Sequence, residues 1–288
     1  MTGREMAEAG EGTPGGTPPD KDPAAAAPLV DTHCHLDFPD YDADRDQVVQ
    51  AAREAGVVAM ITIGIDLASS RRAVELAERY AGVYAAVGIH PHSAAEVTPA
   101  ALDELRRLAR HPRVVAIGEI GLDYYRDRVP APEQRRAFRA QLELAAECGL
   151  PVIIHNRDAE ADVWDQLAGL AGTAGAPLRG VMHCFGAGPD WALRFCALGL
   201  YVGLDGPVTF KNGERAREVA RAVPEDRLLV ETDAPFLAPH PYRGRRNQPA
   251  WVRLVAERIA QERGRTLAEI ARQTTANAAR LFGLPVEP

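Results

Sequence analysis

Lysine is almost absent from this 288-residue sequence, and so is any excess of positive charge. Only Lys21 and Lys211 are lysines, and the 33 basic side chains are outnumbered by 40 acidic ones, which gives a net charge of −7. This balance excludes a broadly basic, DNA-coating protein, because such a protein carries a positive surface. It leaves room for an enzyme that holds nucleic acid through a small basic patch.

Paired cysteines and long hydrophobic runs are also missing. The four cysteines form no CxxC pair, so they predict reduced thiols in the cytoplasm rather than a disulfide framework or a cysteine-based zinc site. Apolar runs such as 57–65 are too short to cross a bilayer, which takes about 20 residues, and the N-terminus lacks the apolar core of a secretion signal. The motifs HExxH, GxxxxGKS/T and GxSxG are absent, so zinc-protease, P-loop and serine-hydrolase functions have no support.

The first 28 residues differ from the rest in composition. They are rich in glycine, proline, alanine and acidic residues and contain no aromatic side chain. Such a segment buries too little apolar surface to offset its ordering entropy. We therefore expect a disordered tail over 1–28 and one folded domain over 29–288.

Within the expected domain, eight short apolar runs alternate with longer amphipathic segments. The runs begin at Leu29, Val57, Tyr84, Val114, Val152, Gly180, Leu200 and Leu228. Their mean spacing of about 28 residues suits a strand followed by a helix, and runs that are apolar on both faces are typical of buried parallel strands. Eight such units predict an α/β fold, the (β/α)8 TIM barrel. A doubly wound open sheet is the alternative, but no GxGxxG follows the first strand.

Helix signals stand between several of these runs. Thr98 followed by proline reads as a helix start, and the segment that Pro132 opens ends at Gly149. A further helix is expected from Pro249 to Gly264. Thr266 then predicts the start of a short helix, with a separate helix following through Phe282.

Histidines and carboxylates stand at or just after the ends of five predicted strands. They are His33, His35, Glu119, His155, His183 and Asp233. All strand C-termini of a barrel open onto the same face, so these side chains should converge. His33 and His35 are two residues apart on a strand, which points both the same way with Cα atoms about 6.6 Å apart. Two imidazoles at that spacing can bind one metal ion, while Cys34 faces the helical layer as an ordinary buried thiol.

Six ligands are too many for a single catalytic zinc ion, which takes three from the protein. They suit two ions about 3.5–4 Å apart with one bridging carboxylate, an arrangement that lowers the pKa of a bridging water and neutralises charge on the attacked and leaving oxygens. The mixed nitrogen and oxygen set suits zinc, manganese, cobalt or iron, whereas a pure magnesium site is expected to have fewer imidazoles. The residues themselves thus predict a dinuclear metal hydrolase.

Two further groups are candidates for substrate contact. His90 and His92 follow the third strand, where they can bind phosphate, orient a water or support the metal ligands from outside. Arg243, Arg245 and Arg246 cluster in a loop after the eighth strand, and guanidinium groups match phosphate geometry. A solvated loop is the alternative for the arginines.

Seven motifs occur in order along 29–288. They are DTHCHLD at 31–37, GIHPH at 88–92, GEIGLDY at 118–124, PVIIH at 151–155, MHCF at 182–185, ETDAPFL at 231–237 and NAARLF at 277–282. With these motifs the chain resembles the TatD-type metal-dependent deoxyribonucleases, a branch of the amidohydrolase-like barrels. Two loops differ from the family pattern: Gln248 stands where glutamate is usual, and Phe185 to Gly188 replaces the usual Ser-Gly. The tail has no counterpart.

The resemblance implies a division of labour at the site. One ion would be held by His33, His35 and Asp233, the second by His155 and His183, with Glu119 bridging them. Asp233 would also take the proton from the attacking water, and His90 would lie near a substrate phosphate. The implied reaction is the metal-dependent removal of nucleotides from the 3′ end of single-stranded DNA, with RNA as a further substrate and Mg²⁺, Mn²⁺ or Zn²⁺ as the cofactor.

Two other functions are compatible with the same residues. A deacylase or amidohydrolase acting on a carbonyl substrate, such as a D-aminoacyl-tRNA, would use the same metal pair. Such an enzyme has less need than a nuclease of arginines that bind phosphate. A non-catalytic barrel with a structural metal is the second alternative. In every case we expect a cytoplasmic monomer that binds no membrane, because the chain is acidic and has no obvious exposed apolar stripe.

Overall fold

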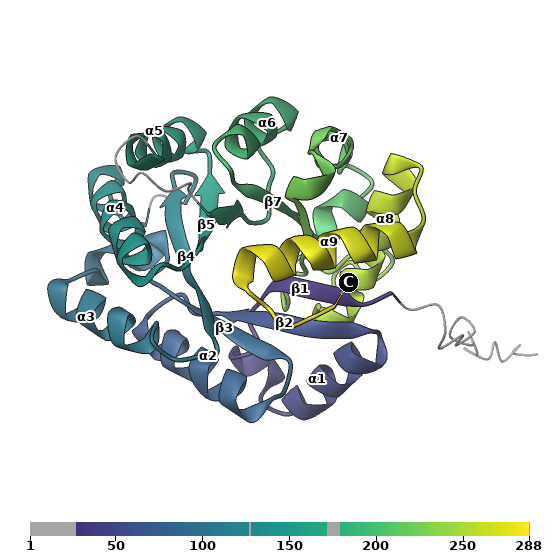
Figure 1. The fold of residues 1–288 in the computed structure, drawn as a ribbon, viewed down its shortest axis with the longest axis horizontal. Coiled ribbons are helices and arrows are strands. Elements are labelled where there is room, and N and C mark those ends of the chain that lie inside the picture. Colours follow the sequence, from purple (N-terminus) through teal and green to yellow (C-terminus); the bar gives the residue numbers. More distant parts are fainter. Residues whose placement is uncertain (1–26, 127, 172–178, 288) are drawn as a thin grey trace, which may run out of the picture.

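Eight parallel strands form one sheet in which every strand pairs with its neighbours in chain order, which confirms the predicted (β/α)8 barrel (Figure 1). The computed structural model describes residues 27–126, 128–171 and 179–287, so the predicted tail lies outside the described residues except for its last two. The strands are β1 (Leu29–Cys34), β2 (Val57–Ile63), β3 (Val83–Val87), β4 (Val114–Asp123), β5 (Val152–Arg157), β6 (Gly180–Met182), β7 (Tyr201–Leu204) and β8 (Leu228–Val230).

The sheet closes between its first and last strands just beyond the end of β8. The backbone N–H of Asp233 donates to the carbonyl of His33 over 2.9 Å, and that of His35 donates to Ala234 over 2.7 Å. The closing seam therefore runs through three of the predicted site residues, which places them at the C-terminal end of the barrel.

Helices surround the strands (Figure 1). They are α1 (Arg45–Glu54), α2 (Leu67–Arg79), α3 (Pro99–Leu108), α4 (Ala131–Cys148), α5 (Glu160–Ala171), α6 (Pro189–Ala197), α7 (Glu214–Ala222), α8 (Val252–Arg263) and α9 (Leu267–Phe282). The predicted start of α3 is confirmed, because the Thr98 side chain accepts a hydrogen bond from the N–H of Ala101. Gly149 ends α4 in a left-handed conformation with φ 67°.

The prediction of two separate helices after Thr266 is wrong. A single helix, α9, continues for 16 residues after a capping box between Thr266 and Glu269. The polar pair at 274 and 275 does not interrupt it, since the Thr274 hydroxyl donates back to the carbonyl of Ile270 and the Thr275 hydroxyl donates to Pro28. Helix α8 also begins later than expected, because residues Pro249–Trp251 form a 3-10 turn.

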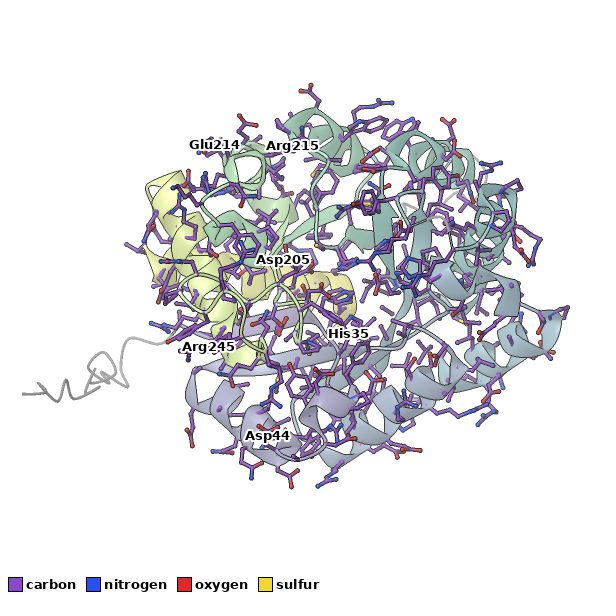
Figure 2. All side chains as sticks on the ribbon, turned by 180° about the vertical axis from the view of Figure 1, so that it is seen from behind. His35, Asp44, Asp205, Glu214, Arg215 and Arg245 are labelled. Carbon is purple, nitrogen blue, oxygen red and sulfur yellow. The ribbon has the colours of Figure 1, made fainter. Side chains whose placement is uncertain are left out.

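Helix α9 covers the N-terminal end of the barrel (Figure 1). Its Leu281 and Phe282 pack with the side chains that fill the barrel interior, among them Val30, Ile61 and Ile153. A separate core lies between the strands and the surrounding helices. One end of the barrel is thus plugged, and the opposite end, seen in Figure 2 with His35 and Asp205 toward its centre, is left for the site. None of the described helices is long and apolar enough to cross a bilayer.

Candidate active site

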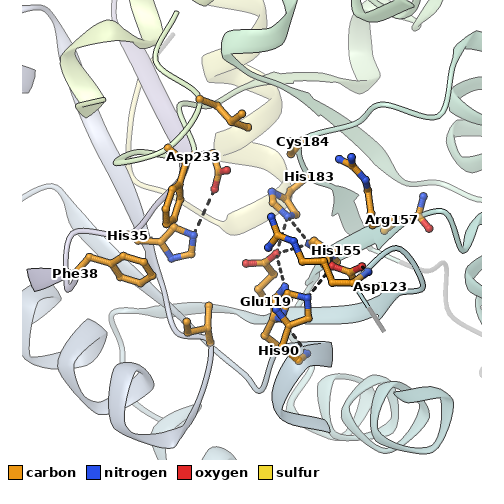
Figure 3. A pocket seen from close by; sticks show the side chains of 16 residues that line it. His35, Phe38, His90, Glu119, Asp123, His155, Arg157, His183, Cys184 and Asp233 are labelled. Atoms are coloured by element: carbon orange, nitrogen blue, oxygen red, sulfur yellow. Dashed lines mark hydrogen bonds and ion pairs between the residues drawn. The ribbon is translucent and has the colours of Figure 1, made fainter. Parts of the chain in front are cut away.

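The six side chains predicted to converge lie together at the C-terminal end of the barrel (Figure 3). They come from β1, β4 and β5, from the residues that directly follow β1 and β6, and from the third residue after β8. Their ligand atoms form overlapping groups, each within 4.8 Å: His33 with His35 and Asp233, and His33 with Glu119 and His183.

The first group faces the seam of the barrel. The Nε2 atoms of His33 and His35 are 3.3 Å apart, and Oδ1 of Asp233 lies 3.6 Å and 3.4 Å from them. Two imidazole nitrogens on one tetrahedral zinc ion stand about 3.4 Å apart, given Zn–N bonds of 2.0–2.1 Å. The observed spacing therefore fits a shared divalent cation.

The second group is built around Glu119. Its Oε1 lies 2.7 Å from Nε2 of His183 and 2.8 Å from Nδ1 of His155, and these two nitrogens are 3.5 Å apart. Its other oxygen, Oε2, lies 3.6 Å from Nε2 of His33. The rings of His33 and His183 stack with centroids 3.9 Å apart. One carboxylate therefore joins the two groups, one oxygen to each.

The outward nitrogens of two site histidines have acceptors of their own. Nδ1 of His35 lies 3.3 Å from the carbonyl oxygen of Ile63, and Nε2 of His155 lies 3.3 Å from Oδ2 of Asp123. An acceptor on the outside holds the ring proton there and leaves the inward nitrogen with a free lone pair. The cluster is thus rich in lone pairs and carboxylate charge, which is the donor chemistry that divalent zinc or manganese takes.

Without a cation, protons on the imidazoles balance the carboxylates. Burial opposes the charged form of His183, but Glu119 and Glu231 outweigh it and raise the pKa of His183 well above its ordinary value. Burial likewise opposes ionisation of Glu119, yet His183, His90 and His155 hold the pKa of Glu119 well below its usual range. The site is therefore electrostatically organised around an ionised Glu119.

A cavity of about 510 Å³ opens onto this cluster (Figure 3). This volume lies in the range that holds small ligands. Phe38, Phe236 and Leu237 give one part of the lining an apolar character, whereas Arg126 and Arg157 add positive charge. The cavity thus offers contacts for both an apolar ring and an anion.

His90 and His92 also line the cavity. Nε2 of His90 lies 3.5 Å from Oε1 of Glu119, and Nε2 of His92 lies 2.8 Å from Oδ2 of Asp123. Asp123 therefore supports two histidines at once, His92 and His155.

The three loop arginines do not line this cavity. Arg246 forms a two-point ion pair with Asp44, at 2.8 Å and 2.5 Å. Arg243 lies over the ring of Phe210, 3.6 Å from its centroid. Their contact with substrate stays a prediction, and it would concern parts of the substrate outside the cavity.

Sequence reasoning gave no role to four residues near the cluster: Asp123, Arg126, Arg157 and Asp205. Asp123 is the last residue of β4, and Asp205 directly follows β7. The rule that selected the other carboxylates, a position at the C-terminal end of a strand, would have selected both. Arg157 is likewise the last residue of β5, but only histidines and carboxylates at strand ends were considered, and Arg126 lies beyond a strand end in a chain that contains 31 arginines.

A family model described as "TatD related DNase" matches residues 30–283. The "Uncharacterized metal-dependent hydrolase YabD" of Bacillus subtilis is 45% identical over 254 residues, covering 88% of this chain and 98% of that protein. The "3'-5' ssDNA/RNA exonuclease TatD" of Cronobacter sakazakii is 40% identical over 267 residues, covering 88% of this chain and 97% of that protein. Among solved structures, the TatD homolog YJJV of Escherichia coli K12 superposes with a TM-score of 0.84 at 32% identity, covering 90% of this chain and all of that one.

Proposed function

This chain belongs to the TatD related DNase family of metal-dependent hydrolases, and from that premise we propose that it removes nucleotides from the 3′ end of single-stranded DNA, with RNA as a further substrate. The observation that carries the proposal is the pair of ligand groups joined by Glu119 at the floor of a cavity with cationic side chains. Such a cavity can hold a phosphodiester against two divalent ions.

The proposed ligands of each ion are the side chains whose nitrogen and oxygen atoms lie closest together. His33, His35 and Asp233 would hold one ion, His155 and His183 would hold the second, and Glu119 would contribute to both. When bound, two ions lower the pKa of a shared water and neutralise the charge that develops on the phosphate oxygens. The donor set fits Mn²⁺ or Zn²⁺, and Mg²⁺ is the remaining candidate from the sequence.

The side chains supply orientation and a proton acceptor. Asp233 takes the proton of the attacking water, because burial is outweighed by His35 and His33, which lower the pKa of Asp233 and keep it ionised. Asp123 holds the ring of His155 through its outer nitrogen, so that the inner nitrogen stays turned to Glu119. His90 lies beside Glu119, where its ring can contact a substrate phosphate.

The cavity lining supports a single nucleic-acid strand as the substrate. Arg126 and Arg157 give charge for a phosphate next to the reacting one, and the exposed ring of Phe236 gives a face on which a base can stack. A base can reach such a face only if it is unpaired. Arg243, Arg245 and Arg246 would then contact the strand farther from the cluster.

The test uses oligonucleotides labelled at either end. Wild-type protein and Glu119→Gln are incubated with 3′- and 5′-labelled single-stranded DNA in Mg²⁺, Mn²⁺ or Zn²⁺. We expect metal-dependent shortening from the 3′ end by the wild type and none by the variant. Glu104→Gln, which changes a half-buried glutamate on α3 that pairs with Arg71 and does not line the cavity, is the matched control and should match the wild type.

Intact DNA in every metal would overturn the nuclease proposal. RNA and D-aminoacyl-tRNA are then assayed with the same three proteins, since a metal pair also activates water against a carbonyl. Charge reversal at Arg245 and Arg246 separates the two chemistries, because it should slow nuclease turnover much more than turnover of a small neutral ester.

We also propose that the enzyme works as a cytoplasmic monomer. All four cysteines are free thiols, as expected in a reducing compartment. Sedimentation at several protein concentrations tests the oligomeric state, and a mass that rises with concentration would contradict the monomer.

A further inference from the structure

A third group of metal-type ligands lies beside the two already described. It consists of Cys184, Asp205 and Asp233, whose Sγ and carboxylate oxygens all lie within 4.8 Å of one another. The three residues follow β6, β7 and β8, which are neighbouring strands. The proposed reaction uses Asp233 but gives no task to Cys184 or Asp205.

Asp205 is a buried carboxyl group with no cationic partner among the described residues, and burial together with Glu231 and Asp233 raises the pKa of Asp205 well above its ordinary value. Asp205 is 3% exposed, and no hydrogen-bond partner for its Oδ2 occurs among the described residues. Nor does any described lysine, arginine or histidine form an ion pair with it. A buried carboxylate of this kind is costly unless something pairs with it. One carboxylate oxygen of Asp205 belongs to the Cys184 group, so a cation held between these side chains would also be a partner for Asp205.

The backbone holds the other two ligands in an unusual way. Cys184 has φ 45° and Asp233 has φ 54°, both in the left-handed region that residues other than glycine seldom adopt. The N–H of Cys184 donates to Oε1 of Glu231 over 2.6 Å, and Glu231 is fully buried. Non-glycine residues persist in this region when the surrounding structure fixes them, and such positions cluster at functional sites.

The group is accessible from the cavity. Cys184 and Asp233 are both part of its lining, on the side that faces His183 and His35 (Figure 3). Three protein ligands with an opening to solvent leave a fourth position free, which is the pattern of an exchangeable zinc site.

We propose that Cys184, Asp205 and Asp233 form a third divalent-cation site, selective for zinc-like ions over magnesium. Thiolate is a soft ligand that favours zinc or cobalt, whereas magnesium prefers oxygen alone. A tetrahedral zinc ion holds sulfur and oxygen ligands about 3.5 Å apart, so the side chains need only close inward from their present spacing. Binding releases the thiol proton of Cys184 to solvent, and Asp233 is shared with the His33 and His35 group.

The test follows the metal rather than the reaction. Full-length protein is freed of metal, dialysed against Co²⁺ and examined by absorption spectroscopy and elemental analysis. We expect a thiolate-to-cobalt charge-transfer band in the near ultraviolet and, with Zn²⁺, three bound ions per chain. Cys184→Ala should lose the band and one ion, and Asp205→Asn should bind one ion fewer.

Cys148→Ala is the matched control, because Cys148 lies at the end of α4, away from the cavity, and is also a free thiol. It should keep both the band and the third ion. Circular dichroism shows whether each variant is folded, and Cys184→Ser provides a second thiol-free protein if the alanine variant is not. Absence of the band from the wild type, or an unchanged band in folded Cys184→Ala, would overturn the proposal.

The expected count of three rests on the proposed pair of ions, but the band does not. A protein without nuclease activity that still shows the cobalt band would fail the proposed function and keep this site. A protein that has nuclease activity but whose cobalt form lacks the band would support the proposed function and overturn this site.

Discussion

At the scale of the residue, the site depends on which ring nitrogen each histidine turns inward. Oxygens of Ile63 and Asp123 accept on the outer side of His35 and His155, and this fixes the inner nitrogens as electron-pair donors. Position along the chain predicted which side chains converge. It could not predict which atom of each ring faces the centre, because that depends on acceptors contributed by other strands.

Glu119 is the residue on which both ligand groups depend. Replacing it with glutamine removes the charge and exchanges one of the two carboxylate oxygens for an amide NH2 group, which does not bind a cation. We expect Glu119→Gln to weaken metal binding by more than about 100-fold, since even residues that only support metal ligands typically cost 10–100-fold. Isothermal titration with Mn²⁺ measures this, with Glu104→Gln as the control. Unchanged affinity would show that Glu119 does not hold the ions.

The arginines that line the cavity are expected to contact substrate phosphates. If Arg157 contacts a phosphate, Arg157→Ala should reduce the slope of log affinity against log salt by about 0.7, the value for one phosphate contact on a single strand. Binding of labelled single-stranded DNA in Ca²⁺, across a salt series, measures the slope. Arg253→Ala, on α8, is the control and should leave it unchanged. An equal slope for wild type and Arg157→Ala would place the phosphate elsewhere.

At the scale of the element, the short strands β6 to β8 contribute His183, Asp205 and Asp233 from the residues that follow them. Periodicity and spacing predicted the starts of these strands to within one residue, because buried parallel strands need apolar side chains on both faces. The same reasoning wrongly divided α9 in two, although the threonines at its centre do not interrupt the helix. Their hydroxyls bond to Ile270 and Pro28, a partnership that depends on the folded chain.

Position 203 on β7 accepts only glycine, because the carboxylate of Glu231 occupies the space where a side chain would lie. A Cβ atom at this position would lie 2.4 Å from Oε2 of Glu231. Glu231 cannot easily move, since it accepts hydrogen bonds from Thr32 and from the N–H of Cys184. Gly203→Ala should therefore destabilise the protein by about 1–3 kcal/mol, as overpacking does.

Urea denaturation measures that loss. The comparison is Gly169→Ala in α5, where a Cβ atom would meet, among the described residues, nothing within 4 Å beyond its chain neighbours and the nearby backbone of its own helix. This control should raise stability by about 0.5–1 kcal/mol, because alanine loses less entropy than glycine in a helix. A neutral Gly203→Ala would mean that β7 and β8 can shift apart without cost.

At the scale of the whole molecule, the two ends of the barrel have separate tasks. Helix α9 plugs the N-terminal end, and the C-terminal end carries the cavity and its ligands. The same kind of substitution should therefore lower stability at the N-terminal end of the barrel and impair activity at the C-terminal end.

Two phenylalanines test this separation. Phe282→Ala, at the plugged end, should lower the free energy of unfolding by about 3–5 kcal/mol and leave the turnover of the folded protein unchanged. Phe236→Ala, at the open end where the ring is 48% exposed, should change stability by less than about 0.5 kcal/mol and weaken substrate binding. Guanidinium denaturation and steady-state kinetics of both proteins check this. Loss of turnover in folded Phe282→Ala would contradict it.

In the proposed function, Glu119 joins two metal positions at the open end of the barrel. Anomalous X-ray diffraction from crystals grown with Mn²⁺ tests this most directly. We expect one peak among His33, His35 and Asp233 and a second beside His155 and His183, with the Glu119 carboxylate between them. A map with no peak within reach of Glu119, or with peaks only at the protein surface, would contradict the account.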